Sequence, residues 1–353
     1  MALGKLWVDA NYFYGVADHA NMMSSDPALG SAAIATDAAI LMQSLAAVGG
    51  STMGATGLAT SVATPIINVG LMTLTAASNT LGFGRPEDGE RFTDGARQFS
   101  DANDELQQAV PPPDWQGDAS DAYGLRNTEQ QQRAGSMATF DGQIQEVLAE
   151  EAGQVQDTRD FVSTRQVMLA AAIPAAITAK LIPPGGAAAA MAIELAAVAA
   201  TVPFAMQRVT EMVSHSADNA DRIRQIGSHY GVVDESAQMP GGLSGAQSGT
   251  PAPLRVSESI RGTAGIQQNV AATIDSARSA PDGSAGDVFK THGVVCTSTA
   301  AALKSAELAR RSAAEKMHLI STDLSAKLGS SATEYSHTEQ QNADAVDRQM
   351  PPR

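Results

Sequence analysis

Cys296 and His292 are the side chains with the clearest potential for nucleophilic chemistry, because a spacing of four residues would place both on one face of a helix. An imidazole beside a thiol can lower the pKa of that thiol and produce a reactive thiolate. No third residue in the sequence is placed to orient the imidazole, so we interpret the pair as neighbours on a helix face. Cys296 is the one cysteine, which leaves it either a small buried residue or half of an intermolecular disulfide.

Other signatures of catalysis or metal binding are missing from the sequence. The six histidines are scattered, with no HExxH motif or closely spaced Cys/His set. There is no GxSxG motif, and no lysine follows the glycines of residues 49–57 as a phosphate-binding loop requires. Glu194 is the one carboxylate in a strongly apolar setting. We therefore predict a protein without enzymatic activity, cofactor or metal.

The composition predicts the elements that would position these residues. Hydrophobic residues make up 43% of the chain but aromatic residues only 4%, and alanine supplies much of the apolar content. Alanine has the highest helix propensity and lets helices approach closely. No segment alternates β-branched and polar residues with a period of two. The sequence therefore predicts an all-α fold of long, closely packed helices.

The charge limits the classes of partner. A formal net charge of -15 excludes a nucleic-acid-binding role, which needs a basic surface, and it disfavours docking onto anionic lipid. Residues 1–18 lack the basic start and apolar core of a Sec signal peptide. We expect a protein that, if it leaves the cell, uses another route.

Breaks in composition divide the sequence into five predicted parts. They are an Ala/Gly-rich apolar helical region (1–84), a helical hairpin (85–165), an apolar helical segment with a polar helix (166–234), a Gly/Ser/Pro linker (235–253) and a second helical hairpin (254–348). The linker assignment follows from its composition, which is typical of flexible chain.

Each hairpin is predicted from a narrow apolar stripe with spacings of three and four. The first stripe contains Phe92, Ala96, Phe99, Asn103, Leu106 and Val110; Pro111–Pro113 then stops the helix, and a returning helix continues to about residue 165. The second stripe contains Val256, Ile260, Thr263, Gln267, Val270, Ile274 and Ala277, and its returning helix is expected to run unbroken from Val288 to Leu328. Such narrow, Ala-rich stripes predict contacts with helices of other proteins.

The apolar segment 166–206 has two interpretations. Its best candidate for a membrane span, Gly185 to Met206, has about the minimum length for a bilayer core. Glu194 near its middle would cost about 2.5–3.5 kcal/mol to insert. We therefore expect a buried pair of helices, with membrane insertion as the alternative.

Residues 88–175 resemble the EspA/EspE-type substrates of ESX (type VII) secretion. The resemblance rests on Trp115-Gln116-Gly117, on the following Asp118 to Tyr123, and on Gln154 to Asp160 in the returning helix. It implies a WxG-type helical hairpin with Trp115, Gly117 and Tyr123 at its turn. An indole at this point can cover the open end of two helices, and a glycine lets the backbone reverse.

Residues 255–348 resemble the small EspC-type helical substrates, through His292-Gly293, Cys296 and Ala332 to Glu339. The resemblance implies that Tyr335 and Glu339 form a C-terminal YxxxE export signal. It also implies a secreted or cell-envelope-associated protein whose partners are the ESX machinery (its ATPase or a chaperone) and helical ESX co-substrates. Membrane contact and homo-oligomerisation stay open. On a helix, Tyr335 and Glu339 would lie one turn apart on one face.

Overall fold

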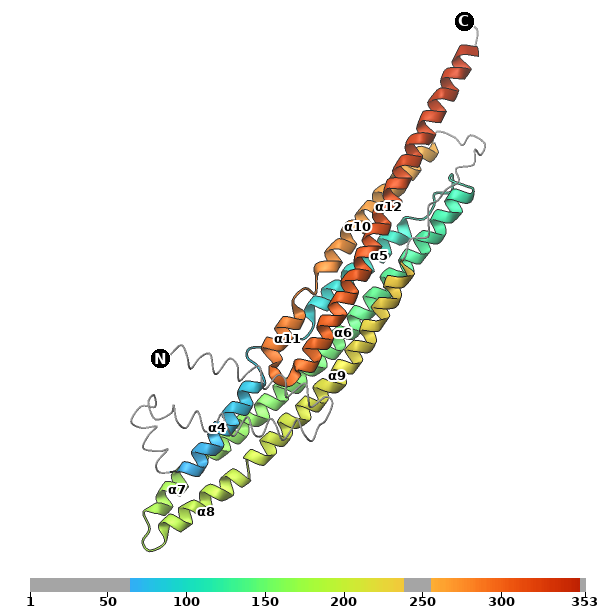
Figure 1. Cartoon of the computed structure of the whole chain (residues 1–353). Helices are drawn as coiled ribbons and strands as arrows, with labels where there is room; N and C mark the ends of the chain where they lie inside the picture. The colour runs from blue at the N-terminus through green and yellow to red at the C-terminus, as the bar shows by residue number, and fades with distance from the viewer. Residues whose placement is uncertain (1–63, 238–254, 350–353) are drawn as a thin grey trace, which may run out of the picture. The chain divides into compact units, whose positions relative to one another are not determined.

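The computed structural model describes residues 64–237 and 255–349, and all elements in these ranges are helical (Figure 1). The helices are α4 (Pro65–Thr80), α5 (Glu90–Gln108), α6 (Asp118–Ala171), α7 (Ile173–Lys180), α8 (Gly186–Ala199), α9 (Val202–Ser236), α10 (Arg255–Ser279), α11 (Ser284–His292), the 3₁₀ turn η1 (Val294–Cys296) and α12 (Thr297–Gln349). The predicted all-α class is confirmed. Most of the predicted N-terminal region and of the linker lies outside the described residues.

The described chain forms two compact units, each built from separate stretches of sequence. Unit 1 comprises residues 64–88, 147–222 and 283–303, and unit 2 comprises residues 89–146, 223–282 without the undescribed 238–254, and 304–349. The long helices α6, α9 and α12 each contribute residues to both. The domain boundaries that composition suggests stay predictions.

The first hairpin lies in unit 2 and consists of α5 and the start of α6. The Asn127 side-chain amide on α6 donates to the Leu106 carbonyl near the end of α5 at 2.8 Å. Phe92, Phe99 and Leu106 are fully buried, as the stripe predicts. Val110 is 53% exposed, because α5 ends at Gln108 and the helical spacing no longer holds there; the prediction for Val110 was wrong.

The second hairpin, α10 and the part of α12 in unit 2, packs against the first. Its antiparallel pairing is visible in two contacts: His318 on α12 with the Ala271 carbonyl (3.0 Å), and the Ser325 hydroxyl donating to the Ala264 carbonyl (2.8 Å). Gln130 on α6 donates to Ser321 on α12 at 3.0 Å, linking the two hairpins. The apolar stripes therefore cover each other inside one bundle.

The returning helix of the second hairpin is broken, which corrects the prediction of an unbroken stripe from Val288 to Leu328. Helix α11 ends at His292, Gly293 follows with φ +77°, and the η1 turn leads into α12 at Thr297. His292 and Cys296 are consequently not neighbours on one helix face. The chain reverses local direction between them because a glycine permits a left-handed φ.

Unit 1 packs α4, α7 and α8 around the second half of α6 and the first half of α9. Its core is aliphatic: Ile67, Leu74, Leu81, Val155, Val162, Leu169, Ala176, Ala205, Val209 and Met212 are among the buried residues. Glu194 on α8 is only 2% exposed and accepts the Ile66 and Ile67 backbone N–H groups at 2.9 and 3.4 Å. It also pairs with Lys180 at 3.5 Å. This carboxylate thus stabilises the N-terminus of α4.

The helical pair α7–α8 differs from the expectation of a buried pair. The buried residues of the two helices include small ones such as Ala176 and Ala190. Larger apolar side chains on their outer faces and on the adjoining turns are exposed, with Leu181 at 76% and Ile182 at 62%. By length and composition, the helical stretches Asp118–Lys180 and Gly186–Ser236 could each cross a membrane, although the same test admits core helices of soluble proteins.

Candidate functional site

The turn of the first hairpin brings Trp115 and Tyr123 together. Their ring centroids are 5.6 Å apart, and the side chains are 6% and 2% exposed. The Tyr123 hydroxyl donates to the Ala109 carbonyl at 2.6 Å, and the Ser120 hydroxyl donates to the Trp115 carbonyl at 2.8 Å. Burial raises the pKa of Tyr123 to about 12, although a hydrogen bond from Gln267 opposes the shift. These contacts hold the end of α5 against the start of α6.

Gly117 lies directly before α6 and has φ +103°, a conformation that favours glycine. Its carbonyl accepts the Asp121 backbone N–H at 3.1 Å, which begins the first turn of the helix. No atom lies within 4 Å of the position that a Cβ would occupy. The glycine is therefore required here by backbone conformation and not by lack of space.

The same turn packs on the second hairpin. Trp115 and Tyr123 share an apolar cluster with Ile260, Ala264, Leu324, Leu328 and Ala332, and Tyr335 lies against that cluster. The Gln267 amide on α10 donates to the Tyr123 hydroxyl at 2.9 Å and to the Asn127 side-chain oxygen at 3.2 Å. The indole thus closes both its own hairpin turn and the contact with the other hairpin.

Tyr335 and Glu339 lie on α12 with partly buried side chains. The Tyr335 ring rests on the cluster at the hairpin turn. Both carboxylate oxygens of Glu339 are covered and have no hydrogen-bond partner among the described residues. From Gln340 to Gln349 every residue of α12 is exposed, and Figure 1 shows these last turns continuing past α10. Tyr335 and Glu339 therefore lie at the end of the packed part of α12, directly before its exposed last turns.

Cys296 is fully buried in unit 1, at the end of the η1 turn. A ring nitrogen of His292, the sulfur of Cys296 and a carboxylate oxygen of Glu151 lie within 4.8 Å of one another. Burial and the adjacent Glu151 raise the pKa of the thiol, burial raises the pKa of Glu151 to about 7, and burial lowers the pKa of His292 to about 4. A buried protonated thiol is a poor nucleophile, and an intermolecular disulfide would require the unit to open.

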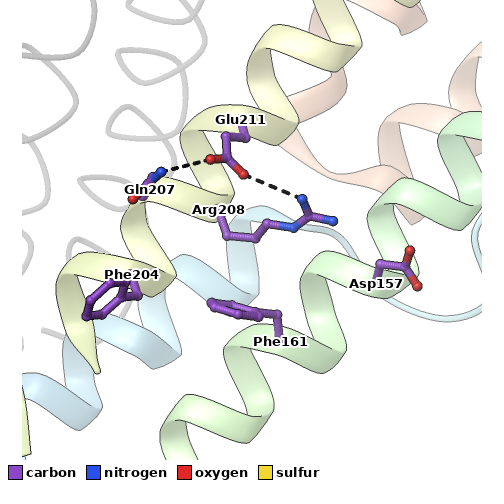
Figure 2. Close-up of a pocket in the computed structure, with 6 residues that line it drawn as sticks. All are labelled: Asp157, Phe161, Phe204, Gln207, Arg208 and Glu211. Atoms are coloured by element: carbon purple, nitrogen blue, oxygen red, sulfur yellow. Dashed lines mark hydrogen bonds and ion pairs between the residues drawn. The ribbon is translucent and has the colours of Figure 1, made fainter. Parts of the chain in front are cut away.

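An open hollow of about 320 Å³ lies elsewhere in unit 1, between α6 and α9. Figure 2 shows Phe161 of α6 and Phe204 of α9 beside it, with Arg208 extending from α9 toward α6. Arg208 pairs with Glu211 at 3.5 Å, and Gln207 donates to Glu211 at 2.9 Å. Three of its polar residues, Gln207, Arg208 and Glu211, thus bind one another, and Asp157 is the one other polar residue of the lining.

Two family models match the chain. The EspA/EspE family matches residues 81–164, and the family described as "Excreted virulence factor EspC, type VII ESX diderm" matches residues 255–348. An uncharacterised EspC-like protein of Mycolicibacterium smegmatis (strain MKD8) is 34% identical over 101 residues, which are 28% of this chain and 96% of that protein. The chain belongs to the EspC family and carries an EspA/EspE region.

Curated EspE proteins also match this EspC-family chain. The ESX-1 secretion-associated protein EspE of M. smegmatis (strain ATCC 700084) is 33% identical over 173 residues, which are 49% of the chain and 33% of that protein. EspE of Mycobacterium tuberculosis (strain H37Rv) is 34% identical over 89 residues, 25% of the chain and 22% of that protein. The chain thus spans a third or less of these EspE proteins. No solved structure matches it.

The hairpin turn of Trp115 and Tyr123 lies in the EspA/EspE region, and Tyr335 and Glu339 lie in the EspC region. The cluster at the turn therefore joins the two family regions within unit 2. The spacing of the sequence did not predict three buried charged residues of this EspC-family chain: Glu151 beside Cys296, and the ion pair of Arg310 and Asp141.

Proposed function

We propose that this protein is a non-enzymatic substrate of an ESX (type VII) secretion system, exported as a folded pair of hairpins that one polypeptide supplies. The end of α12, with Tyr335 and Glu339 on one face, is the surface that the export machinery reads. Recognition falls to the ESX ATPase or a coupled chaperone, and the exported protein is secreted or associated with the cell envelope.

The arrangement of Tyr335 and Glu339 is the observation that carries this proposal. A Tyr and a Glu at positions i and i+4 share one helix face, and both precede the bare last turns of α12. A receptor helix or groove would have access to these turns without opening the bundle. The Glu339 oxygens are covered and lack a hydrogen-bond partner among the described residues, so this side chain has to turn outward before a receptor N–H or cation can bind it.

The packing of the hairpins changes the role of their stripes. The stripes were expected to be completed by helices of other proteins, but in unit 2 they are buried against each other, with Phe99, Ile144, Ile274 and Met317 all fully buried. A separate partner hairpin is therefore not needed to cover them. Helical co-substrates and a second copy of the chain would have to bind other surfaces, and the exposed end of α12 is the foremost of these.

Export of single variants tests the proposal. We expect Tyr335→Ala and Glu339→Ala to abolish accumulation of the full chain in culture fluid, measured by immunoblot with a cytoplasmic lysis marker. His337→Ala is the matched control, because His337 lies between the two residues and is exposed. Circular dichroism of the purified variants confirms retained helicity. Normal secretion of a folded Tyr335→Ala chain would overturn the assignment of the signal.

Membrane insertion is a second candidate function, and the exposed apolar turn between α7 and α8 favours it. Leu181 and Ile182 lie at this turn, and Met191 and Leu195 on α8 are about half exposed. A contiguous patch of exposed apolar side chains often marks a binding surface. With these four large side chains exposed, the pair could enter a bilayer as a hairpin.

Liposome flotation separates insertion from a purely protein-binding role. We expect the full chain to float with zwitterionic vesicles, since its acidity disfavours anionic ones, and Leu181→Asp with Ile182→Asp to abolish flotation. Phe83→Asp is a control, because Phe83 is also exposed, at 65%, but lies outside the α7–α8 pair. Absence of flotation at every pH tested would remove insertion as a function.

A further inference from the structure

Three buried groups that bind metals in other proteins converge in unit 1 from three different elements. Glu151 comes from α6, His292 is the last residue of α11, and Cys296 ends the η1 turn. All three side chains have no exposed surface, and one ligand atom of each lies within 4.8 Å of the others. Carboxylate, imidazole and thiolate are the ligands that Zn²⁺ prefers.

Two atoms of this cluster are buried without a hydrogen-bond partner: Glu151 Oε2 and His292 Nδ1. Buried polar atoms are almost always paired, so an unpaired one calls for an explanation. The other ring nitrogen, Nε2, lies 3.0 Å from the Glu87 carbonyl. A nitrogen that faces a carbonyl carries the proton, which leaves Nδ1 with a free lone pair. This backbone contact is the one that orients metal-binding histidines.

The carboxylate of Glu151 is also held in place. Its Oε1 accepts the Thr299 hydroxyl at 2.9 Å, and Ser216 bonds the same hydroxyl at 2.9 Å. These contacts fix one oxygen and leave Oε2 without a hydrogen-bond partner among the described residues. The arrangement resembles the outer contacts that fix a carboxylate ligand.

The backbone around His292 and Cys296 is held by close contacts. A Cβ at Gly293 would lie 2.2 Å from the Thr80 carbonyl oxygen and 2.3 Å from the Gly82 nitrogen, so only glycine fits this crossing. The Arg159 guanidinium donates to the Leu81 carbonyl at 2.9 Å and also to the Thr291 carbonyl. The segment that presents both ligands is therefore preorganised.

We propose that Glu151, His292 and Cys296 bind one divalent zinc ion inside unit 1. The charges balance, because an ionised carboxylate, a thiolate and a neutral imidazole with one divalent cation sum to zero in a buried setting. Binding releases the protons of the thiol and the carboxyl group. The positive charge of Arg159 acts on this cluster, because it lowers the pKa of both Cys296 and His292. This charge favours the Cys296 thiolate but repels the bound zinc ion. A water would complete a four-coordinate ion.

Cobalt substitution tests the site on the unaltered chain. The full chain is purified under reducing conditions, stripped with a chelator and titrated with Co²⁺ and, separately, with Zn²⁺. We expect one equivalent of either ion and, with Co²⁺, a thiolate-to-metal charge-transfer band in the near ultraviolet. Zn²⁺ should raise the melting temperature, because an ion that binds only the folded state stabilises it. Co²⁺ uptake without a thiolate band would overturn the proposal.

Substitutions identify the ligands. We expect Cys296→Ser to remove the charge-transfer band, and Cys296→Ser, Glu151→Gln and His292→Gln each to weaken Zn²⁺ binding by more than about 100-fold. Thr299→Val should weaken it by about 10–100-fold through loss of carboxylate orientation. Glu150→Gln and His215→Gln are the matched controls, since both residues are exposed. Unchanged affinity in Cys296→Ser and Glu151→Gln would also overturn the proposal.

Discussion

Arg310 and Asp141 form a two-pronged ion pair within unit 2, with side chains 1% and 0% exposed. Arg310 Nη2 lies 2.6 Å from Asp141 Oδ2, and Nε lies 2.7 Å from Oδ1. The Tyr230 hydroxyl donates to Oδ1 at 2.6 Å, and the guanidinium also donates to the Ala277 carbonyl at 2.9 Å. Burial alone would lower the pKa of Arg310, but Asp141 outweighs it and raises that pKa. The pair thus links α6, α9, α10 and α12.

Removing one partner of this pair should be costly. Arg310→Leu leaves the Asp141 carboxylate buried without its cation, and we expect the free energy of unfolding to fall by about 3–5 kcal/mol. Urea unfolding followed by circular dichroism measures it. The double variant Arg310→Leu with Asp141→Leu should recover much of the loss, because no charge is then left buried. A single variant as stable as the parent would contradict this role.

Gly95 on α5 lies directly against the ion pair. A Cβ at this position would be 2.5 Å from both Arg310 Nη2 and Asp141 Oδ2, so we expect Gly95→Ala to destabilise unit 2 by about 1–3 kcal/mol. Gly142→Ala on α6 is the control: no atom lies within 4 Å of its Cβ, and alanine should stabilise that helix by about 0.5–1 kcal/mol. Thermal unfolding of both variants shows whether the signs differ as expected.

Tyr123 should make the protein sensitive to alkali. Its pKa in the folded chain is about 12 against an ordinary value of 10.0, so the folded state keeps a proton that the unfolded state loses. The resulting stability is fully present below pH 10 and is lost as the pH rises from 10 to 12, to a total of at most about 3 kcal/mol. Urea unfolding at several pH values measures this slope, which should be smaller in Tyr123→Phe. Equal slopes would show that Tyr123 is not responsible.

Trp115 should contribute several kcal/mol to the free energy of unfolding, because it lies in the apolar cluster that both hairpins share. Trp115→Ala removes the indole from the cluster that both hairpins share, and we expect a loss of about 3–5 kcal/mol, as for other buried tryptophans. Trp115→Phe keeps much of the apolar contact and should cost less. The indole N–H has no hydrogen-bond partner among the described residues, so the phenylalanine variant loses no such bond. A small loss in Trp115→Ala would mean that the turn closes without the ring.

Spacing predicted the helices and most of their buried faces. All of the second stripe whose burial is described, Ile260, Thr263, Gln267, Val270, Ile274 and Ala277, is buried. The resemblance pointed to Trp115 and Tyr123, whose rings lie 5.6 Å apart in the structure. The break at Gly293 was not foreseen, because a single glycine within a periodic segment does not by itself indicate whether the helix ends there.

The charged residues in the core were missed, although the spacing contains a signal for them. Asp141 lies between the buried Met137 and Ile144, and Glu151 lies between Leu148 and Val155. These steps of three and four place each carboxylate on the buried face. Which cation or other group would meet them depends on the tertiary pairing of helices far apart in sequence. The interleaved composition of the two units depends on the same pairing.

The location of both hairpins on one polypeptide has a consequence for the protein at low concentration. Two separate chains that pair through such apolar stripes dissociate when they are diluted. Two hairpins on one chain instead have an effective concentration for each other of about millimolar. The contact between Tyr123 and Gln267 therefore persists however few molecules share a compartment. The two hairpins are also always present in equal number, so neither requires its production to be matched to the other.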